Sequence, residues 1–308
     1  MSAAWPDIPY EPWRETCSAL HLYTQIVGKY RLARTPWINH SWHATFYVNA
    51  CGFTSSLVPD RPGGVEISFD LLDHTVKGAA TDGRSAQFSL GPMSVAEFHR
   101  RFIDMIGTLG GTPKFHWRPN EVPNPVPFTE DRAQRPYAAD AVTRFFKALA
   151  AVNEVLRDFR TSYVGKVSPV HLFWGSFDLA VTRFSGRRAP FHPGGVPGLP
   201  DEVTREAYSH EVSSAGFGLE VEGSISRRSI PTPIRRQTAS PMCAWPRMRR
   251  ISTSAWASLS CPMMPCGARV IRRQRSSPFW RAPIERLLIS AAGIAQRWNS
   301  QAEAVVIE

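Results

Sequence analysis

The stretch that decides the fold runs from residue 65 to residue 90, "VEISFDLLDHTVKGAATDGRSAQFSL". Its three pieces "VEISFDLLD", "HTVKGAA" and "SAQFSL" have the length and alternation of apolar and polar residues that are typical of β-strands. Asp82-Gly83 lies between the last two pieces and is a dipeptide typical of tight β-hairpins. We therefore predict a run of antiparallel strands.

The sequence on either side extends this prediction. "WHATFYVNA" and "GFTSSLV" are two further strand-like pieces before residue 65. Apolar residues recur at helical spacing from Pro12 to Leu32. Ser94 is expected to cap a second helix, which reaches about Leu109 before Gly110-Gly111 end it. Residues 1–118 therefore form a predicted unit of helix, antiparallel sheet and helix.

A second unit is predicted after a Pro-rich linker at residues 119–137. It spans residues 138–217 and starts with a helix from about Ala138 to Tyr163. Its sequence can be aligned with the first unit: Val27-Gly28-Lys29 falls on Val164-Gly165-Lys166, Pro36 on Pro169, and His40 near His171. We infer an α+β fold built from a duplicated unit, with a candidate pocket between the two copies.

The last part of the chain, residues 218–308, has a different composition. It holds 14 of the 36 Lys and Arg, all of them Arg, but only 5 of the 26 Asp and Glu. The net charge of +10 therefore comes almost entirely from this tail, and residues 1–217 are close to neutral. For that reason we predict neither a nucleic-acid partner nor a membrane partner.

The composition of the tail is typical of GC-rich DNA that is translated in the wrong reading frame. One base inserted after the Phe217 codon, with synonymous codons chosen freely, turns "GLEVEGSISRRSIPTPI" into "WPGGGGVDFPAFYSYAYP" and restores strands and a closing helix further on. The second unit is then incomplete in this chain, and we expect this copy to be inactive. A true disordered Arg-rich tail is the alternative.

Other features limit the class of protein. The five Cys form no CxxC pair, so neither a zinc site nor a disulfide framework is predicted. The N-terminal residues "MSAAWPDIPYEPWRE" have no signal-peptide pattern, and the longest uncharged run is too rich in Ser, Pro and Cys to span a bilayer. We expect a cytoplasmic protein. No cofactor and no oligomeric state follow from the sequence.

Three segments concentrate polar side chains among aromatic ones: "INHSWH", "HLFWGSFDLAVTRFSGRR" and "REAYSHEVSS". The candidate catalytic residues are His171 and His210 as acid and base, with Glu211 orienting. The candidate ligand-binding residues are His40, Trp174, Asp178, Arg183 and Arg187, with one of the two Arg holding an anion.

Each candidate also has a structural interpretation. His40 and His43 would point to opposite faces of a strand, which favours structural His over a metal site. Asp178 with Arg183 or Arg187 is expected to form a partly buried ion pair. His210 and Glu211 would diverge in a strand. Trp174 could stack on a flat ligand or belong to the core.

Long segments carry a family resemblance: "LHLYTQIVGKYRLARTPWINHSWH", "SPVHLFWGSFDLAVTRFSGRRAPFHPGGVP" and "TREAYSHEVSSAGF". In these residues and their order, the chain from residue 5 to residue 217 resembles an uncharacterised bacterial family, domain of unknown function 5996. The family implies no activity. Two functions stay open: an enzyme that acts on a small polar or anionic molecule, and a non-catalytic ligand-binding or interaction module.

Overall fold

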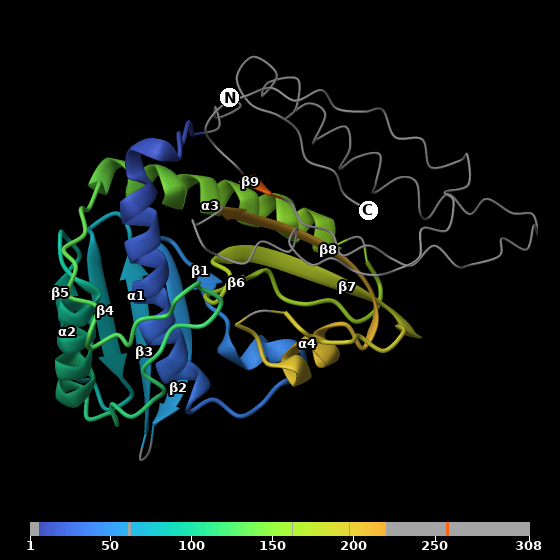
Figure 1. Cartoon of the computed structure of the whole chain (residues 1–308), viewed down its shortest axis with the longest axis horizontal. Helices are drawn as coiled ribbons and strands as arrows, with labels where there is room; N and C mark the ends of the chain where they lie inside the picture. Colours follow the sequence, from blue (N-terminus) through green and yellow to red (C-terminus); the bar gives the residue numbers. More distant parts are fainter. Residues whose placement is uncertain (1–5, 61–62, 162, 197, 220–256, 259–308) are drawn as a thin grey trace, which may run out of the picture.

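The computed structural model describes residues 6–60, 63–161, 163–196, 198–219 and 257–258 of the 308. Its fold is α+β, as the sequence predicts, with helices packed on antiparallel sheets (Figure 1). None of the helices in these ranges is long and apolar enough to cross a bilayer.

The predicted run of strands is a five-stranded antiparallel sheet in the order β1-β2-β3-β4-β5. Its strands are β1 (Tyr47–Val48), β2 (Gly52–Asp60), β3 (Gly63–Asp70), β4 (Thr75–Ala80) and β5 (Ser85–Ser89). The Asp82-Gly83 turn is confirmed, because Gly83 has a φ of 92° and the Ala80 N–H donates to the Arg84 carbonyl at 2.8 Å. Glycine takes this left-handed conformation at little steric cost.

One face of this sheet carries much of the apolar core. Alternate strand residues are buried there, including Phe53, Val65, Ile67, Phe69 and Val76. The helices α1 (Arg14–Leu32) and α2 (Val95–Thr108) cover this face, and a short 3-10 helix, η1 (Glu11–Trp13), leads into α1 (Figure 1). Between the helices the rings of Tyr23 and Phe98 stack with centroids 4.3 Å apart.

The ends of α2 follow the sequence prediction. The Glu97 N–H donates to the Ser94 hydroxyl at 3.1 Å, which caps the start of the helix. Gly110 has a φ of 70° just beyond its last turn. At the start of the helix the Tyr23 hydroxyl donates to the Met93 carbonyl at 2.9 Å and ties α1 to α2.

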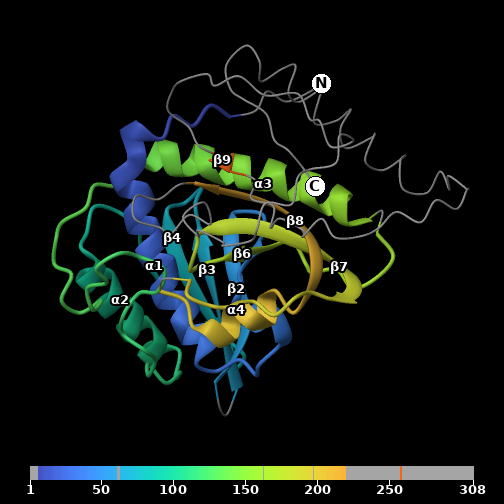
Figure 2. The same cartoon turned by 45° about the vertical axis from the view of Figure 1, so that its right-hand side comes forward.

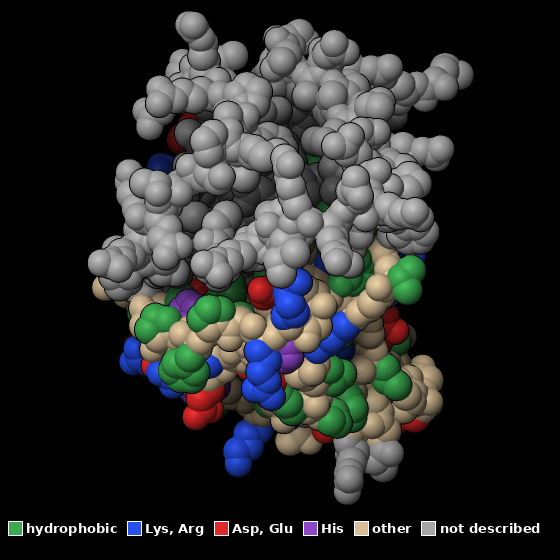
Figure 3. All heavy atoms as spheres, turned by 90° about the vertical axis from the view of Figure 1, so that its right-hand side faces the viewer, with side chains coloured by type: hydrophobic (Ala, Val, Ile, Leu, Met, Phe, Trp, Pro, Cys, Tyr) green, Lys and Arg blue, Asp and Glu red, His purple; other side chains and the backbone are tan. Residues whose placement is uncertain are grey.

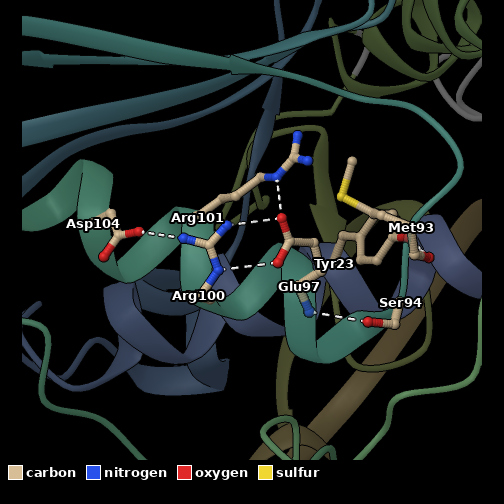
Figure 4. Close-up of polar contacts among 7 residues, drawn as sticks. All are labelled: Tyr23, Met93, Ser94, Glu97, Arg100, Arg101 and Asp104. Carbon is tan, nitrogen blue, oxygen red and sulfur yellow. Dashed lines mark hydrogen bonds and ion pairs between the residues drawn. The ribbon is translucent and has the colours of Figure 1, made fainter.

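The outer side of α2 carries a row of charged side chains. Figure 4 shows the Glu97 carboxylate between Arg100 and Arg101, with Arg100 also paired to Asp104. The Arg100 side chain is 61 % exposed, so these ion pairs each contribute about 0–1 kcal/mol.

The second sheet has the order β6-β7-β8-β9. Its strands are β6 (His171–Phe173), β7 (Asp178–Arg188), β8 (His210–Leu219) and β9 (Ala257–Ser258). The long helix α3 (Ala139–Thr161), confirmed almost to the residue, packs against β7 and β8 (Figure 2). A short helix that the sequence did not predict, α4 (Asp201–Ala207), lies between β7 and β8 in the chain.

The two sheets meet at one backbone bridge. Phe46 and Leu172 exchange two hydrogen bonds, at 2.9 and 2.8 Å, just before β1 and within β6. The order of strands therefore continues from one sheet to the other across this seam.

One local prediction is only partly confirmed. Of the expected strand from Trp42 to Val48, Tyr47–Val48 form β1, whereas Trp42, His43 and Ala44 belong to a 3-10 helix, η2 (Asn39–Ala44), in which His40 and Ser41 have left-handed φ angles of 60° and 58°. Gly28 lies inside α1, whereas its aligned counterpart Gly165 lies beyond the end of α3 with a φ of 155°. The aligned residues thus differ in local conformation, and the duplication stays a prediction.

The frame-shift prediction concerns residues 218–308, most of which lie outside the described residues. The exceptions are Gly218 and Leu219, which complete β8 and pair with Ser258 and Ala257 of β9. The predicted disorder and restored strands of the remaining tail are therefore not tested.

Candidate functional site

One group of polar side chains lies where η2, α4 and the segment before β6 meet. The Lys166 ammonium donates to Nε2 of His40 at 2.9 Å. The Glu206 carboxylate, from α4, accepts the His40 backbone N–H at 3.2 Å and the Trp37 indole N–H at 3.4 Å. We call His40, Lys166, Glu206 and His210 the His40 cluster.

The backbone of η2 is strained at this point. His40 and Ser41 are consecutive non-glycine residues in the left-handed region, which costs on the order of 1–3 kcal/mol for each residue. Such strain persists only where the surroundings hold it, and it is frequent at binding and catalytic sites. Here the Glu206 carboxylate holds the His40 N–H, and Trp42 and Phe184 flank the imidazole with centroids 5.8 and 4.5 Å away.

Aromatic rings also surround the cation. The Lys166 ammonium lies 5.3 Å from the Trp42 ring centroid and 4.7 Å from that of Phe184. Both distances lie within the range of cation–π attraction. Lys166 as a residue is exposed, although its ammonium group is held in place.

The electrostatics of the cluster favour a neutral His40. Burial first, and then the Lys166 ammonium, hold the pKa of His40 below its usual value, while the Glu206 carboxylate opposes this shift and nearby His210 adds to it. Because Lys166 is a donor, Nε2 of His40 is the acceptor and its proton lies on Nδ1. Nδ1 is buried without a hydrogen-bond partner among the described residues.

His210 and Glu211 begin β8 and do not act as a pair. The Ser209 hydroxyl lies 3.0 Å from Nδ1 of His210. The Glu211 carboxylate instead accepts from Arg187 at 2.6 Å and from Ser185 at 3.1 Å. Neighbouring side chains of a strand point to opposite faces, so Glu211 does not orient His210.

Several positively charged side chains lie near the C-terminal end of β7. Lys166, Arg187 and Arg188 are all exposed, and Arg188 is the register partner of His210. Figure 3 faces the side of the molecule where β7 ends in Figure 1, and Lys and Arg side chains group beside a histidine there.

His171 and Trp174 belong to the core. His171 is 1 % exposed, burial lowers its pKa to about 3, and its Nδ1 lies 3.3 Å from the Thr45 hydroxyl. The Trp174 indole N–H donates to the Ala44 carbonyl at 2.6 Å, and its ring lies so close to Gly28 that a methyl group there would overlap it. The geometry therefore does not favour His171 as an acid or base that meets a ligand.

The prediction that Asp178 forms an ion pair with Arg183 or Arg187 is wrong. Ser176 donates to the Asp178 carboxylate, Arg187 pairs with Glu211, and the Arg183 guanidinium lies 3.5 Å from the centroid of Phe159 on α3. The physical reason is distance, because five or nine residues along an extended strand span about 16 or 30 Å.

The sequence interpretation missed two central members of the cluster. Lys166 stood within a quoted motif, but nothing in its spacing indicated contact with His40. Glu206 stood within "REAYSHEVSS" and was not selected, because the helix α4 that positions it was not predicted.

His43 contacts Ile38 through Nδ1 at 3.2 Å, and the described ranges contain no group of three or more His, Cys, Asp or Glu side chains able to hold a metal ion.

A model of one protein family matches residues 5–225, most of the chain. Its description is "Family of unknown function (DUF5996)". The chain belongs to this family. The match to DUF5996 includes every residue of the His40 cluster and extends eight residues beyond the predicted limit at Phe217. No curated protein and no solved structure matches the chain.

Proposed function

We propose that this DUF5996 protein binds a small anionic molecule at the His40 cluster, without acting on it chemically. The observation that carries the proposal is the Lys166 ammonium, which is held at 2.9 Å by a neutral His40 while the residue stays exposed. A positive group that is fixed in place loses less entropy on binding than a free Lys side chain does.

The neighbours of Lys166 support an anionic ligand. Arg188 and His210 lie opposite each other at the start of β8, so a carboxylate or phosphate near Lys166 would meet further donors. Glu206 is already occupied by the His40 N–H and the Trp37 indole, which reduces its capacity to repel an anion. All of these residues precede residue 218, so none of them belongs to the tail.

Acid–base chemistry at His40 is the second candidate. It is favoured by the neutral imidazole, whose pKa is lowered and whose tautomer is fixed by Lys166. We rank it second because His171, the other predicted acid or base, is buried among core residues. The cytoplasmic location, the bacterial source and the reading-frame error belong to the same proposal and rest on the sequence alone.

Titration of the full chain with inorganic phosphate at low ionic strength tests the proposal. Lys166→Met should raise the Kd for phosphate by about tenfold, which corresponds to about 1.4 kcal/mol, as measured by calorimetry. Lys147→Met, at another exposed lysine, which lies on α3, is the matched control and should leave the Kd unchanged. Equal effects of the two substitutions would mean that phosphate meets only the general surface charge, and the proposal would fail.

A further inference from the structure

Three polar side chains lie buried along one side of α1, where the rest of the helix packs into the apolar core. His21, Gln25 and Lys29 follow each other at intervals of four residues, so they share one face of the helix. They are 1 %, 0 % and 4 % exposed. None of the three belongs to the His40 cluster or to the apolar contacts between α1 and the first sheet described above.

This polar face holds one loop of the Pro-rich linker. The Asn120 N–H donates to the Gln25 side-chain oxygen at 2.7 Å, and the Gln25 amide donates back to the Asn120 carbonyl at 2.8 Å. The Lys29 ammonium donates to the Asn120 side-chain oxygen at 2.9 Å. The contacts are polar, and the loop beyond them is exposed at Pro123, Asn124 and Pro125.

The same loop presses on the turn between β6 and β7. Glu121 has a left-handed φ of 55°, and its carboxylate lies so close to Gly175 that any side chain at that position would overlap it. On the other side of this turn the His21 Nε2–H donates to the Gly175 carbonyl at 2.8 Å. Asn120 and Glu121 therefore fasten the turn to α1.

Trp174 connects this turn to η2. Its ring lies against Gly28 of α1, with the Lys29 ammonium 5.7 Å from its centroid. Its indole N–H holds the carbonyl of Ala44, the last residue of η2. The strained backbone of His40 lies four residues earlier in the same element.

We propose that Asn120 and Glu121 act as a clamp and that Trp174 is a positioning residue, which transmits the clamp to η2 and so sets His40 and Lys166 for the ligand. The inference deepens the proposed function and rests on it for the identity of the ligand. Trp174 does not touch the ligand; it holds the backbone on which the cluster is built. When the loop leaves α1, the turn, Trp174 and η2 lose their common support.

The clamp is tested first at Asn120, in the full chain. Asn120→Ala removes the acceptor of Lys29, whereas Asn120→Asp keeps it. We expect Asn120→Ala to accelerate hydrogen exchange at the residue 120 amide about tenfold and to raise the Kd for inorganic phosphate about tenfold. Asn120→Asp and the control Val126→Ser, an exposed position in the same linker, should stay within about twofold of the wild type for both quantities.

Trp174→Phe tests the positioning role, because it keeps a ring against Gly28 while it removes the donor to Ala44 together with part of the indole. It should weaken phosphate binding about as much as Asn120→Ala and shift the NMR signals of the His40 ring. Faster amide exchange in Asn120→Ala with an unchanged phosphate Kd would overturn the inference while the proposed function stands. If the wild type binds no phosphate, the proposed function fails. The clamp is then judged by NMR alone, and unchanged signals of the His40 ring in Asn120→Ala would overturn it as well.

Discussion

Two groups of aromatic rings, one packed on each sheet, have different partners. Beneath the first sheet, rings lie on rings: Tyr23 on Phe98, and Phe98 on Phe69 with centroids 6.1 Å apart. Beside the second sheet, cations lie on rings, Lys166 by Phe184 and Arg183 over Phe159. A ring stack responds mainly to lost volume, whereas a cation on a ring also responds to charge, salt and pH. The first sheet is therefore expected to carry the stability of the fold and the second its ligand chemistry.

The largest expected effect breaks the ring stack of the first sheet. Phe98→Ala removes a fully buried side chain that contacts Tyr23, Phe69 and Phe88. We expect the free energy of unfolding to fall by about 3–5 kcal/mol, as measured by urea denaturation.

Phe191→Ala is the control for this prediction, because that ring is 79 % exposed. Its substitution should change the free energy of unfolding by less than about 1 kcal/mol. Similar losses at the two positions would show that the stack does not carry the stability of the fold.

The next effect concerns pH and the second sheet. Burial lowers the pKa of His171 to about 3, whereas an unfolded His titrates near 6.5. The folded state therefore keeps this imidazole neutral, and the stability that this contributes is complete above pH 6.5 and lost as the pH falls toward 3. Between pH 7 and pH 5 the loss is about 2 kcal/mol.

Denaturation of the wild type and of His171→Asn at both pH values measures this loss. The substitution has its own cost, which cancels when each protein is compared with itself at the two pH values. The difference between pH 7 and pH 5 should shrink by about 2 kcal/mol in the variant. If the difference in unfolding free energy between pH 7 and pH 5 is the same in the variant, His171 does not cause the acid sensitivity. His21 would then be the next residue to replace, because burial lowers its pKa to about 4.

The smallest expected effect comes from replacing two glycines, each of which lies inside a helix. A methyl group at Gly107 of α2 would meet nothing within 4 Å, whereas one at Gly28 of α1 would overlap the Trp174 ring. Gly107→Ala should stabilise the protein by about 0.5–1 kcal/mol through helix propensity alone. Gly28→Ala gains the same propensity but should destabilise by about 1 kcal/mol net, because overpacking outweighs it. Melting temperatures that shift in the same direction would contradict close packing of Trp174.

Much of the fold could be predicted from the sequence, because its signals were local. The Asp82-Gly83 turn, the Ser94 cap and the helix at residues 139–161 each depend on residues within a few positions, and the structure has all three. The α+β class follows from their order. The 3-10 helix η2 could not be predicted, because His40 and Ser41 take left-handed angles that a sequence pattern does not favour.

The candidate site was only partly predicted, because its contacts are long-range. His40 and His210 were selected from their surroundings, but Lys166 lies 126 positions from His40 and Glu206 lies 166 positions away. No periodicity encodes such contacts. From the sequence, Trp174 could either stack on a ligand or pack in the core. The structure places it in the core, because Gly28 leaves room for its ring.

The bridge between Phe46 and Leu172 has a consequence for how the chain could be divided. Residues 126 positions apart form the seam, so the long connecting segment, not the seam, keeps the two halves at a high local concentration. Cleavage at the exposed residues 123–126 of the linker, followed by separation of the two fragments, would leave each half with an unsatisfied strand end at this point, able to pair with its former neighbour. The chain is thus suited to reconstitution from two co-expressed fragments, with recovery of the seam as the sign of reassembly.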